Sequence, residues 1–178
     1  TLFRSMARLL IYDAYENKVY TYANLNENDP MPYSTLTTLR LREFRGKSSS
    51  PTLWTTIAAM EAWNLTRRKY GRGIPVGYAF RRIWEGGHGT RSQHYAGVAF
   101  DVGQSLDQRQ RTAIYNAAHA TGAWGYVEPL SQTPLWVCTL NPLLYLPHSR
   151  IVSPCLLRCV QRERNGISSN LSRCKAPG

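Results

Sequence analysis

His94 and Asp101 are the residues of this 178-residue chain whose types and spacing point most directly to chemistry. Imidazole nitrogen and carboxylate oxygen are both ligands of zinc, and the two residues stand seven positions apart on either side of Gly97. A catalytic zinc site takes three protein ligands and keeps a fourth position for water. The pair therefore predicts a metal site, provided that the fold supplies a third ligand.

The backbone after Gly97 determines which way Asp101 faces. Glycine permits a sharp bend, and alternation along a strand then directs Val98 and Phe100 toward a core and Asp101 toward the opposite face. We therefore expect Asp101 to face the loop that contains His94. Each residue alone also fits a structural role, as a surface histidine or a strand-end cap, so the prediction rests on the two together.

Strands and helices that would position this pair are predicted from hydrophobic periodicity and turn residues. Residues 7–22 have the pattern of a β-hairpin, and residues 38–45 alternate like a half-exposed strand. Helical spacing extends over residues 53–70, opened by Pro51, and over residues 106–121. Shorter strands are expected at 74–80, 124–127 and 135–137. These elements predict an α+β fold with a small antiparallel sheet and flanking helices.

Charge and composition narrow the class of partner. The formal charge is +11, from 22 basic and 11 acidic residues, which favours attraction to a polyanion such as nucleic acid, an anionic membrane or an anionic cell wall. A basic surface that is simply solvated is the alternative. The arginines are scattered and do not form one basic helix, so nucleic acid is not the expected partner. No apolar run approaches the ~18–20 residues of a membrane span, and none forms a classical signal peptide.

The end of the chain differs in composition from the rest. Residues 139–178 contain six basic residues against one acidic residue and show no sustained periodicity. All four cysteines fall at or beyond position 138, at Cys138, Cys155, Cys159 and Cys174. We predict one domain over residues 7–138, a weakly ordered basic tail over 139–178, and a non-native or read-through leader over 1–6.

The pattern Ser92-x-His94-x-x-Gly97-x-Ala99-x-Asp101 resembles the metal-binding signature of the VanY-type zinc D-Ala-D-Ala carboxypeptidases and peptidoglycan endopeptidases. The resemblance covers roughly residues 36–137 and is closest to the branch found in cell-wall lysins. It implies a small fold like that of hedgehog and DD-peptidase domains, with Zn²⁺ as cofactor. It also implies that zinc is held by His94, Asp101 and a histidine on a late strand.

Cys138 stands where the resemblance places that second histidine. One interpretation is a His94, Asp101 and Cys138 site, in which the thiolate would make the metal a poorer Lewis acid. The other is a disrupted reading frame near residue 137, because a change of phase there can read Val-His-Phe-Glu. Sequencing the gene would decide between them.

The resemblance also implies a carboxylate that accepts a proton and an arginine that binds a substrate carboxylate or the developing oxyanion. Glu128 is the nearest acidic candidate, since the position three residues before Cys138 is Leu135. Arg81 is the candidate catalytic arginine. The candidate substrate-binding residues are Tyr78, Arg82 and Ser92.

The function expected from the resemblance is zinc-dependent hydrolysis of a peptide bond in peptidoglycan stem peptides, by a carboxypeptidase or an endopeptidase. The alternative is a catalytically impaired relic or a wall-binding module of the same fold. A nucleic-acid-binding domain ranks behind both. We expect a monomer that acts outside the cell at the wall, with an anionic wall polymer as a further partner. Phage-type release or non-classical export would bring it there.

Overall fold

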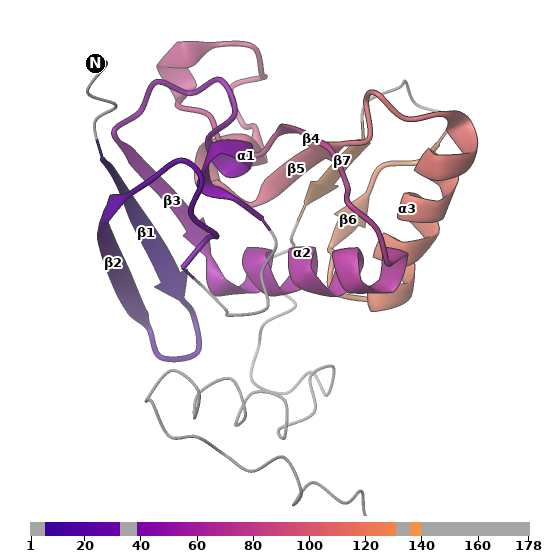
Figure 1. Cartoon of the computed structure of the whole chain (residues 1–178), viewed down its shortest axis with the longest axis horizontal. Coiled ribbons are helices and arrows are strands. Elements are labelled where there is room, and N and C mark those ends of the chain that lie inside the picture. The colour runs from indigo at the N-terminus through magenta and orange to yellow at the C-terminus, as the bar shows by residue number, and fades with distance from the viewer. Residues whose placement is uncertain (1–5, 33–38, 131–135, 140–178) are drawn as a thin grey trace, which may run out of the picture. The chain divides into compact units, whose positions relative to one another are not determined.

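Two β-sheets and three α-helices make up the described part of the chain, residues 6–32, 39–130 and 136–139, in a computed structural model (Figure 1). This mixture of elements confirms the predicted α+β class. The expectation of one small antiparallel sheet was incomplete, because the structure has a second sheet that includes a parallel pair of strands.

The first sheet has the strand order β2-β1-β3. Its strands are β1 (Ala7–Asp13), β2 (Lys18–Leu25) and β3 (Thr52–Thr56). Buried and more exposed residues alternate along β1, as expected for a strand with one face on the core. The predicted hairpin is confirmed by the antiparallel pairing of β1 with β2.

The segment before the first long helix differs from the prediction. Residues 52–56 form β3, which pairs in parallel with β1, and helix α2 (Ile57–Tyr70) begins only after them. Threonine and tryptophan in this stretch favour an extended chain. The Thr56 side chain then accepts a hydrogen bond from the Ala59 N–H and caps the helix. Pro51 therefore precedes a strand and does not open the helix.

The predicted strand over 38–45 was also wrong where the structure describes it. Leu41–Arg45 form the short helix α1, in which Leu41 and Phe44, three positions apart, are both buried. The Glu43 carboxylate accepts a hydrogen bond from the Arg40 N–H at 2.7 Å, which completes a helix cap. The helix cap and the burial of Leu41 and Phe44 therefore favour a helix here, although the sequence alternates briefly like a strand.

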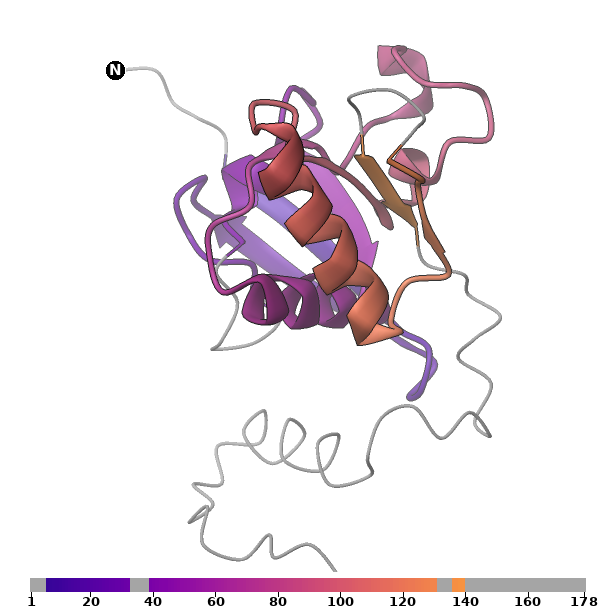
Figure 2. The same ribbon diagram turned by 90° about the vertical axis from the view of Figure 1, so that its right-hand side faces the viewer.

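The second sheet has the strand order β4-β5-β7-β6, and all its pairs are antiparallel. Its strands are β4 (Val76–Tyr78), β5 (Ala99–Val102), β6 (Tyr126–Val127) and β7 (Trp136–Thr139). Helix α3 (Gln108–Thr121) packs against α2 (Figure 2). The predicted helix and strands in this half of the chain are thus present, with shifted ends.

Contacts from β3 join the two sheets next to the segment that contains His94. The Trp54 indole N–H donates to the carbonyl of Tyr95, and the Thr55 hydroxyl donates to the carbonyl of Gly97, each at 2.7 Å. A Cβ at Gly97 would stand 1.9 Å from the carbonyl oxygen of Trp54, and Gly97 has φ +68°. Only glycine allows the backbones to approach this closely in that conformation.

Candidate metal centre

His94 is positioned by a single turn of 3₁₀ helix, η2 (Gln93–Ala96). The Ser92 hydroxyl caps this turn by accepting a hydrogen bond from the His94 N–H at 3.3 Å. Gly97, in the left-handed conformation, ends the turn and leads the chain into β5. Asp101 lies on β5 between two neighbouring strands, paired with Tyr78 on one side and Val137 on the other. The predicted approach of His94 and Asp101 is confirmed.

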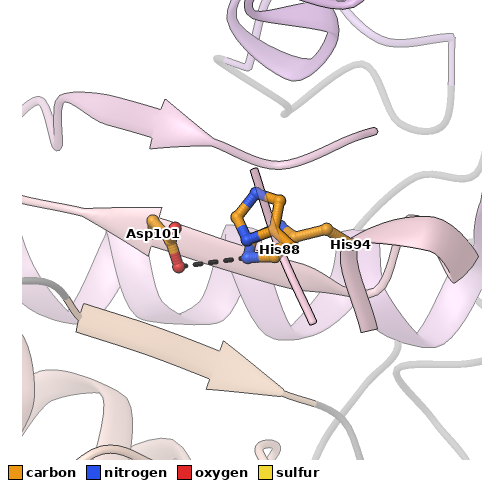
Figure 3. A group of neighbouring side chains, drawn as sticks. All are labelled: His88, His94 and Asp101. Carbon is orange, nitrogen blue, oxygen red and sulfur yellow. Dashed lines mark hydrogen bonds and ion pairs between the residues drawn. The ribbon is translucent and has the colours of Figure 1, made fainter. Parts of the chain in front are cut away.

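The two side chains meet in the interior of the protein, with 2% of His94 and 4% of Asp101 exposed. The Nε2 atom of His94 lies 3.1 Å from Oδ1 of Asp101. Figure 3 marks this contact with a dashed line. The other ring nitrogen, Nδ1, lies 3.2 Å from the carbonyl oxygen of Ala79. Both nitrogens of one buried ring therefore face an oxygen atom.

The nitrogen of the His94 ring that carries the proton determines whether a cation would be favourable between His94 and Asp101. A carbonyl oxygen can only accept, so the contact with Ala79 is a hydrogen bond when the ring carries a proton on Nδ1. In the neutral ring, Nε2 then presents a lone pair to a carboxylate oxygen, and the two repel unless a proton or a cation lies between them. Histidine ligands of metals commonly donate their second nitrogen to a backbone carbonyl. The 3.1 Å separation is also close to the roughly 3.4 Å expected of two donors around tetrahedral zinc.

His88 brings a third donor to this pair. Ligand atoms of His88, His94 and Asp101 all lie within 4.8 Å of one another, a group that could hold a metal ion. The His88 ring stacks on the His94 ring, with centroids 4.3 Å apart. Sequence reasoning assigned His88 no ligand role because it stands in a glycine-rich loop. In the structure, Gly86 and Gly87 have positive φ and let the chain fold back over His94.

The surroundings of His88 favour its neutral form. Burial lowers the pKa of His88, and the neighbouring His94 and Arg81 lower it further, while Asp101 acts in the opposite direction. A neutral imidazole is the form that binds metals. His88 is therefore suited to act as a ligand at neutral pH.

For Cys138, the predicted third ligand, the structure describes only the backbone. Cys138 is paired with Phe100 of β5 and with Val127 of β6, whereas the residue paired with Asp101 is Val137. The side chain of Cys138 lies outside the described part of the chain. Its role as a ligand stays a prediction, as does the frame disruption near residue 137. Of the tail predicted over residues 139–178, residues 140–178 lie outside the described part of the chain.

Tyr78 and Arg81 lie beside the group of donors. The Tyr78 ring makes an edge-on contact with His88, with centroids 5.3 Å apart. The Arg81 guanidinium lies over the Tyr78 ring, with its central carbon 5.5 Å from the ring centroid. The backbone N–H of Arg81 donates to the backbone carbonyl of His94. These two predicted site residues are thus next to His88 and His94.

The other predicted site residues have different surroundings. Arg82 is paired with Glu85 at 2.8 Å and also donates to the Ser49 hydroxyl. Ser92 caps η2, as described above. Glu128 follows β6 directly, is partly buried, and is not a member of the donor group. Their assignment to substrate binding and proton transfer stays a prediction.

Glu85 joins two loops through one carboxylate. Burial raises its pKa, but hydrogen bonds from Arg82, Ser48 and the Ser49 backbone outweigh burial and lower the pKa to about 2. The carboxylate accepts from the Ser48 hydroxyl at 3.1 Å and from the Ser49 N–H at 2.9 Å. Glu85 thereby ties the segment before β3 to the 3₁₀ turn η1 (Ile83–Glu85).

This linkage predicts a loss of stability in acid. Because the pKa of Glu85 is lower in the folded chain than its ordinary value of 4.5, the unfolded chain binds the proton first as the pH falls. The stabilisation by Glu85 is complete above about pH 5 and is lost as the pH falls toward 2. We expect Glu85→Gln to have a shallower dependence of the urea midpoint on pH than the wild type over this range. Equal slopes for the two proteins would contradict the assignment.

No helix among the described residues is long and apolar enough to cross a membrane. Comparison with known proteins finds no family model, curated protein or solved structure that matches this chain significantly.

Proposed function

We propose that this chain is a zinc-dependent peptidase that hydrolyses a peptide bond in peptidoglycan stem peptides. The observation that supports it most is the buried convergence of His94 Nε2 and Asp101 Oδ1, with His88 beside them. Both members of the pair belong to residues 92–101, the segment that resembles the signature of VanY-type peptidases. We extend the proposal to the fold, which would then be of the hedgehog and DD-peptidase type.

Zinc is the metal that we propose for the group. Two imidazole nitrogens and one carboxylate oxygen form a ligand set typical of catalytic zinc sites, which leave the fourth position for water. Calcium and magnesium prefer oxygen ligands, so the two histidines disfavour them. We propose His88 as the third ligand in the place that the sequence suggested for Cys138.

The residues around the site have separate roles in the proposed reaction. Zinc in such a site supplies Lewis-acid polarisation of the scissile carbonyl and lowers the pKa of a water molecule toward ~7. His94 is held in one orientation by the Ala79 carbonyl, and Asp101 is fixed on an inner strand of its sheet. Glu128 is proposed to take the proton of the attacking water and deliver it to the leaving amine.

The net charge supports the proposed place of action. With a formal charge of +11, the chain would be attracted to anionic polymers of a cell wall, which would raise its concentration at the substrate. We therefore propose that it acts outside the cell, at the wall.

A wall-binding module without catalysis is the second candidate. In the described residues no carboxylate other than Asp101 belongs to the donor group, so no second carboxylate stands among the donors to accept a proton. A chain that binds wall polymers and zinc without cleaving them would fit this candidate.

Metal analysis combined with digestion of purified cell wall tests the proposal. We expect the purified chain to retain one zinc ion and to release new amino groups from the wall. We expect chelation or His94→Ala to abolish that release. Retained zinc without any cleavage would favour the binding module, and absence of stoichiometric zinc would reject the peptidase.

Two further variants identify the third ligand in the same assay. We expect His88→Ala to reduce zinc affinity by at least about tenfold, because loss of even a group that orients a ligand costs about 10–100-fold. Cys138→Ser should retain zinc like the wild type. The reverse result, with zinc lost in Cys138→Ser and kept in His88→Ala, would restore the ligand set expected from the sequence.

A further inference from the structure

Ile83 and Trp84 are two large apolar side chains that stand next to each other on the surface. Trp84 is 71% exposed and Ile83 is 54% exposed. A single exposed apolar residue is ordinary, but neighbouring ones form a surface to which another molecule can bind. These two residues follow Arg81 and Arg82 and precede the glycine-rich loop of His88. They therefore stand close in sequence to the metal-binding group.

The turn that carries the two apolar side chains is held in one conformation. The backbone N–H of Arg82, directly before η1, donates to the Glu85 carboxylate at 2.9 Å. The same carboxylate accepts hydrogen bonds from Ser48 and Ser49, which ties the turn to another loop. A fixed turn loses little conformational freedom when a ligand binds, so its exposed side chains are already placed for contact.

Arg82 covers one face of the Trp84 ring. Its guanidinium carbon lies 5.0 Å from the ring centroid, within the range of a cation–π contact. The guanidinium is itself paired with Glu85 at 2.8 Å, so its own position is fixed. The exposed part of the Trp84 side chain therefore belongs to the opposite face and the edges of the indole. The result is a flat aromatic surface with a guanidinium behind it.

A sugar ring is the kind of ligand that suits such a surface. A hexosamine ring has a face of C–H groups, which can pack on an aromatic ring, and polar groups around its edge, which stay in water. The C–H hydrogens carry a small positive charge and meet the negative face of the indole, as ring edges do in edge-to-face aromatic pairs. Arg82 behind the ring disfavours a cationic ligand, which would otherwise compete for the same face.

The distance from Trp84 to the metal-binding group agrees with a sugar that belongs to the substrate itself. Trp84 precedes His88 by four residues, and a chain spans at most ~3.3–3.6 Å per residue, so their Cα atoms are no more than about 14 Å apart. Gly86 and Gly87, both with positive φ, bend the chain between them. A stem peptide is joined covalently to a sugar of the glycan strand. One substrate molecule can therefore reach both Trp84 and the metal-binding group.

We infer that Ile83 and Trp84 form a subsite for a sugar ring of the glycan strand that carries the stem peptide. This inference rests on the proposed function and makes the substrate more specific, because it selects peptides that are still attached to their sugar. It also places the hydrolysed bond toward the sugar end of the stem, since about four extended residues span the available distance.

Matched ligands test whether a sugar is bound. One is a stem peptide joined to a disaccharide of N-acetylglucosamine and N-acetylmuramic acid, and the other is the same peptide without the disaccharide. Binding of each to the full chain is measured by isothermal titration calorimetry, once with zinc and once after chelation. We expect the sugar-bearing peptide to bind about two- to tenfold more tightly in both conditions, the effect of one stacked ring. Equal affinities for the two ligands would overturn the inference.

Variants of Trp84 assign the preference to this residue. We expect Trp84→Ala to remove most of the preference and Trp84→Tyr to retain part of it, because a phenol ring keeps a smaller aromatic face. Both variants should fold like the wild type, since the side chain is mostly exposed. Tyr15→Ala is the matched control, because Tyr15 is 74% exposed and lies in the turn between β1 and β2, which supplies no metal donor. An equal loss of preference in Tyr15→Ala would contradict the assignment.

An anionic membrane is the other partner to which an exposed tryptophan beside arginines is suited. Co-sedimentation with vesicles of phosphatidylglycerol and phosphatidylcholine tests this partner with the same variants. We expect Trp84→Ala to sediment with the vesicles to the same extent as the wild type. A loss of vesicle binding in Trp84→Ala, without any preference for the sugar-bearing peptide in the wild type, would assign the turn to a membrane and overturn the inference.

The two proposals fail in different ways. Zinc-dependent cleavage of cell wall without a preference for the sugar-bearing peptide would retain the peptidase and reject the sugar subsite. A preference that persists after chelation, in a chain that cleaves no wall, would retain the sugar subsite and reject the peptidase.

Discussion

Replacement of Asp101 by asparagine is expected to reduce zinc affinity by at least about 100-fold, because removal of groups that merely orient a ligand already costs about 10–100-fold. The carboxylate oxygen lies 3.1 Å from His94 Nε2, and its loss leaves two imidazoles without the negative ligand. Competition with a fluorescent zinc chelator measures the affinity. Wild-type affinity in the variant would exclude Asp101 as a ligand.

Thermal unfolding of the same variant gives an independent measurement. At free zinc of 100 times its Kd, the wild type gains about 2.7 kcal/mol from mass action, and the variant should gain almost none at that concentration. Without zinc the variant should stay folded, because an asparagine amide can donate to the His94 Nε2 lone pair. Asp107→Asn is the matched control, since Asp107 caps α3 and asparagine caps helices equally well.

Gly97→Ala is expected to destabilise the fold by roughly 2–6 kcal/mol, the sum of a strained left-handed backbone and an overpacked contact. The new Cβ would lie 1.9 Å from the Trp54 carbonyl oxygen, so the backbone itself must move. A loss of this size is a large part of the ~5–15 kcal/mol that stabilises an ordinary domain. The shift of the guanidinium unfolding midpoint measures it.

Gly89→Ala is the control for this prediction. Gly89 is in the same part of the chain, but a Cβ there meets nothing within 4 Å, and its φ is outside the left-handed range. Its alanine variant should differ from the wild type by less than about 0.5 kcal/mol. Similar midpoints for the two alanine variants would show that the close approach at Gly97 is not a strong constraint.

The pairing of His94 with Asp101 could be predicted from the sequence because it depends on local geometry. Within ten residues the chain has a capped turn, a glycine that permits a bend, and the two-residue alternation of a strand. Each of these features can be recognised from its residue types. His88 could not be placed in this way. Its position depends on a glycine-rich loop that folds back onto His94, and loops of this kind have no periodicity to read.

The errors in the fold have related causes. Residues 52–56 became a strand because β1 was available as a parallel partner, and such a partner is separated in sequence by more than forty residues. Leu41–Arg45 became helical because Leu41 and Phe44 both reach the core, which the short alternation within residues 38–45 cannot indicate.

The contacts of β3 with Tyr95 and Gly97 have a consequence for how the protein unfolds. Neither β1 nor β2 supplies a metal donor, yet the parallel partner of β1 supports the turn on which His94 stands. Partial unfolding of the N-terminal sheet should therefore release the proposed zinc ion before the second sheet opens. Zinc release, followed with a chelating dye during slow denaturation, would then report the integrity of a region that takes no direct part in binding the ion.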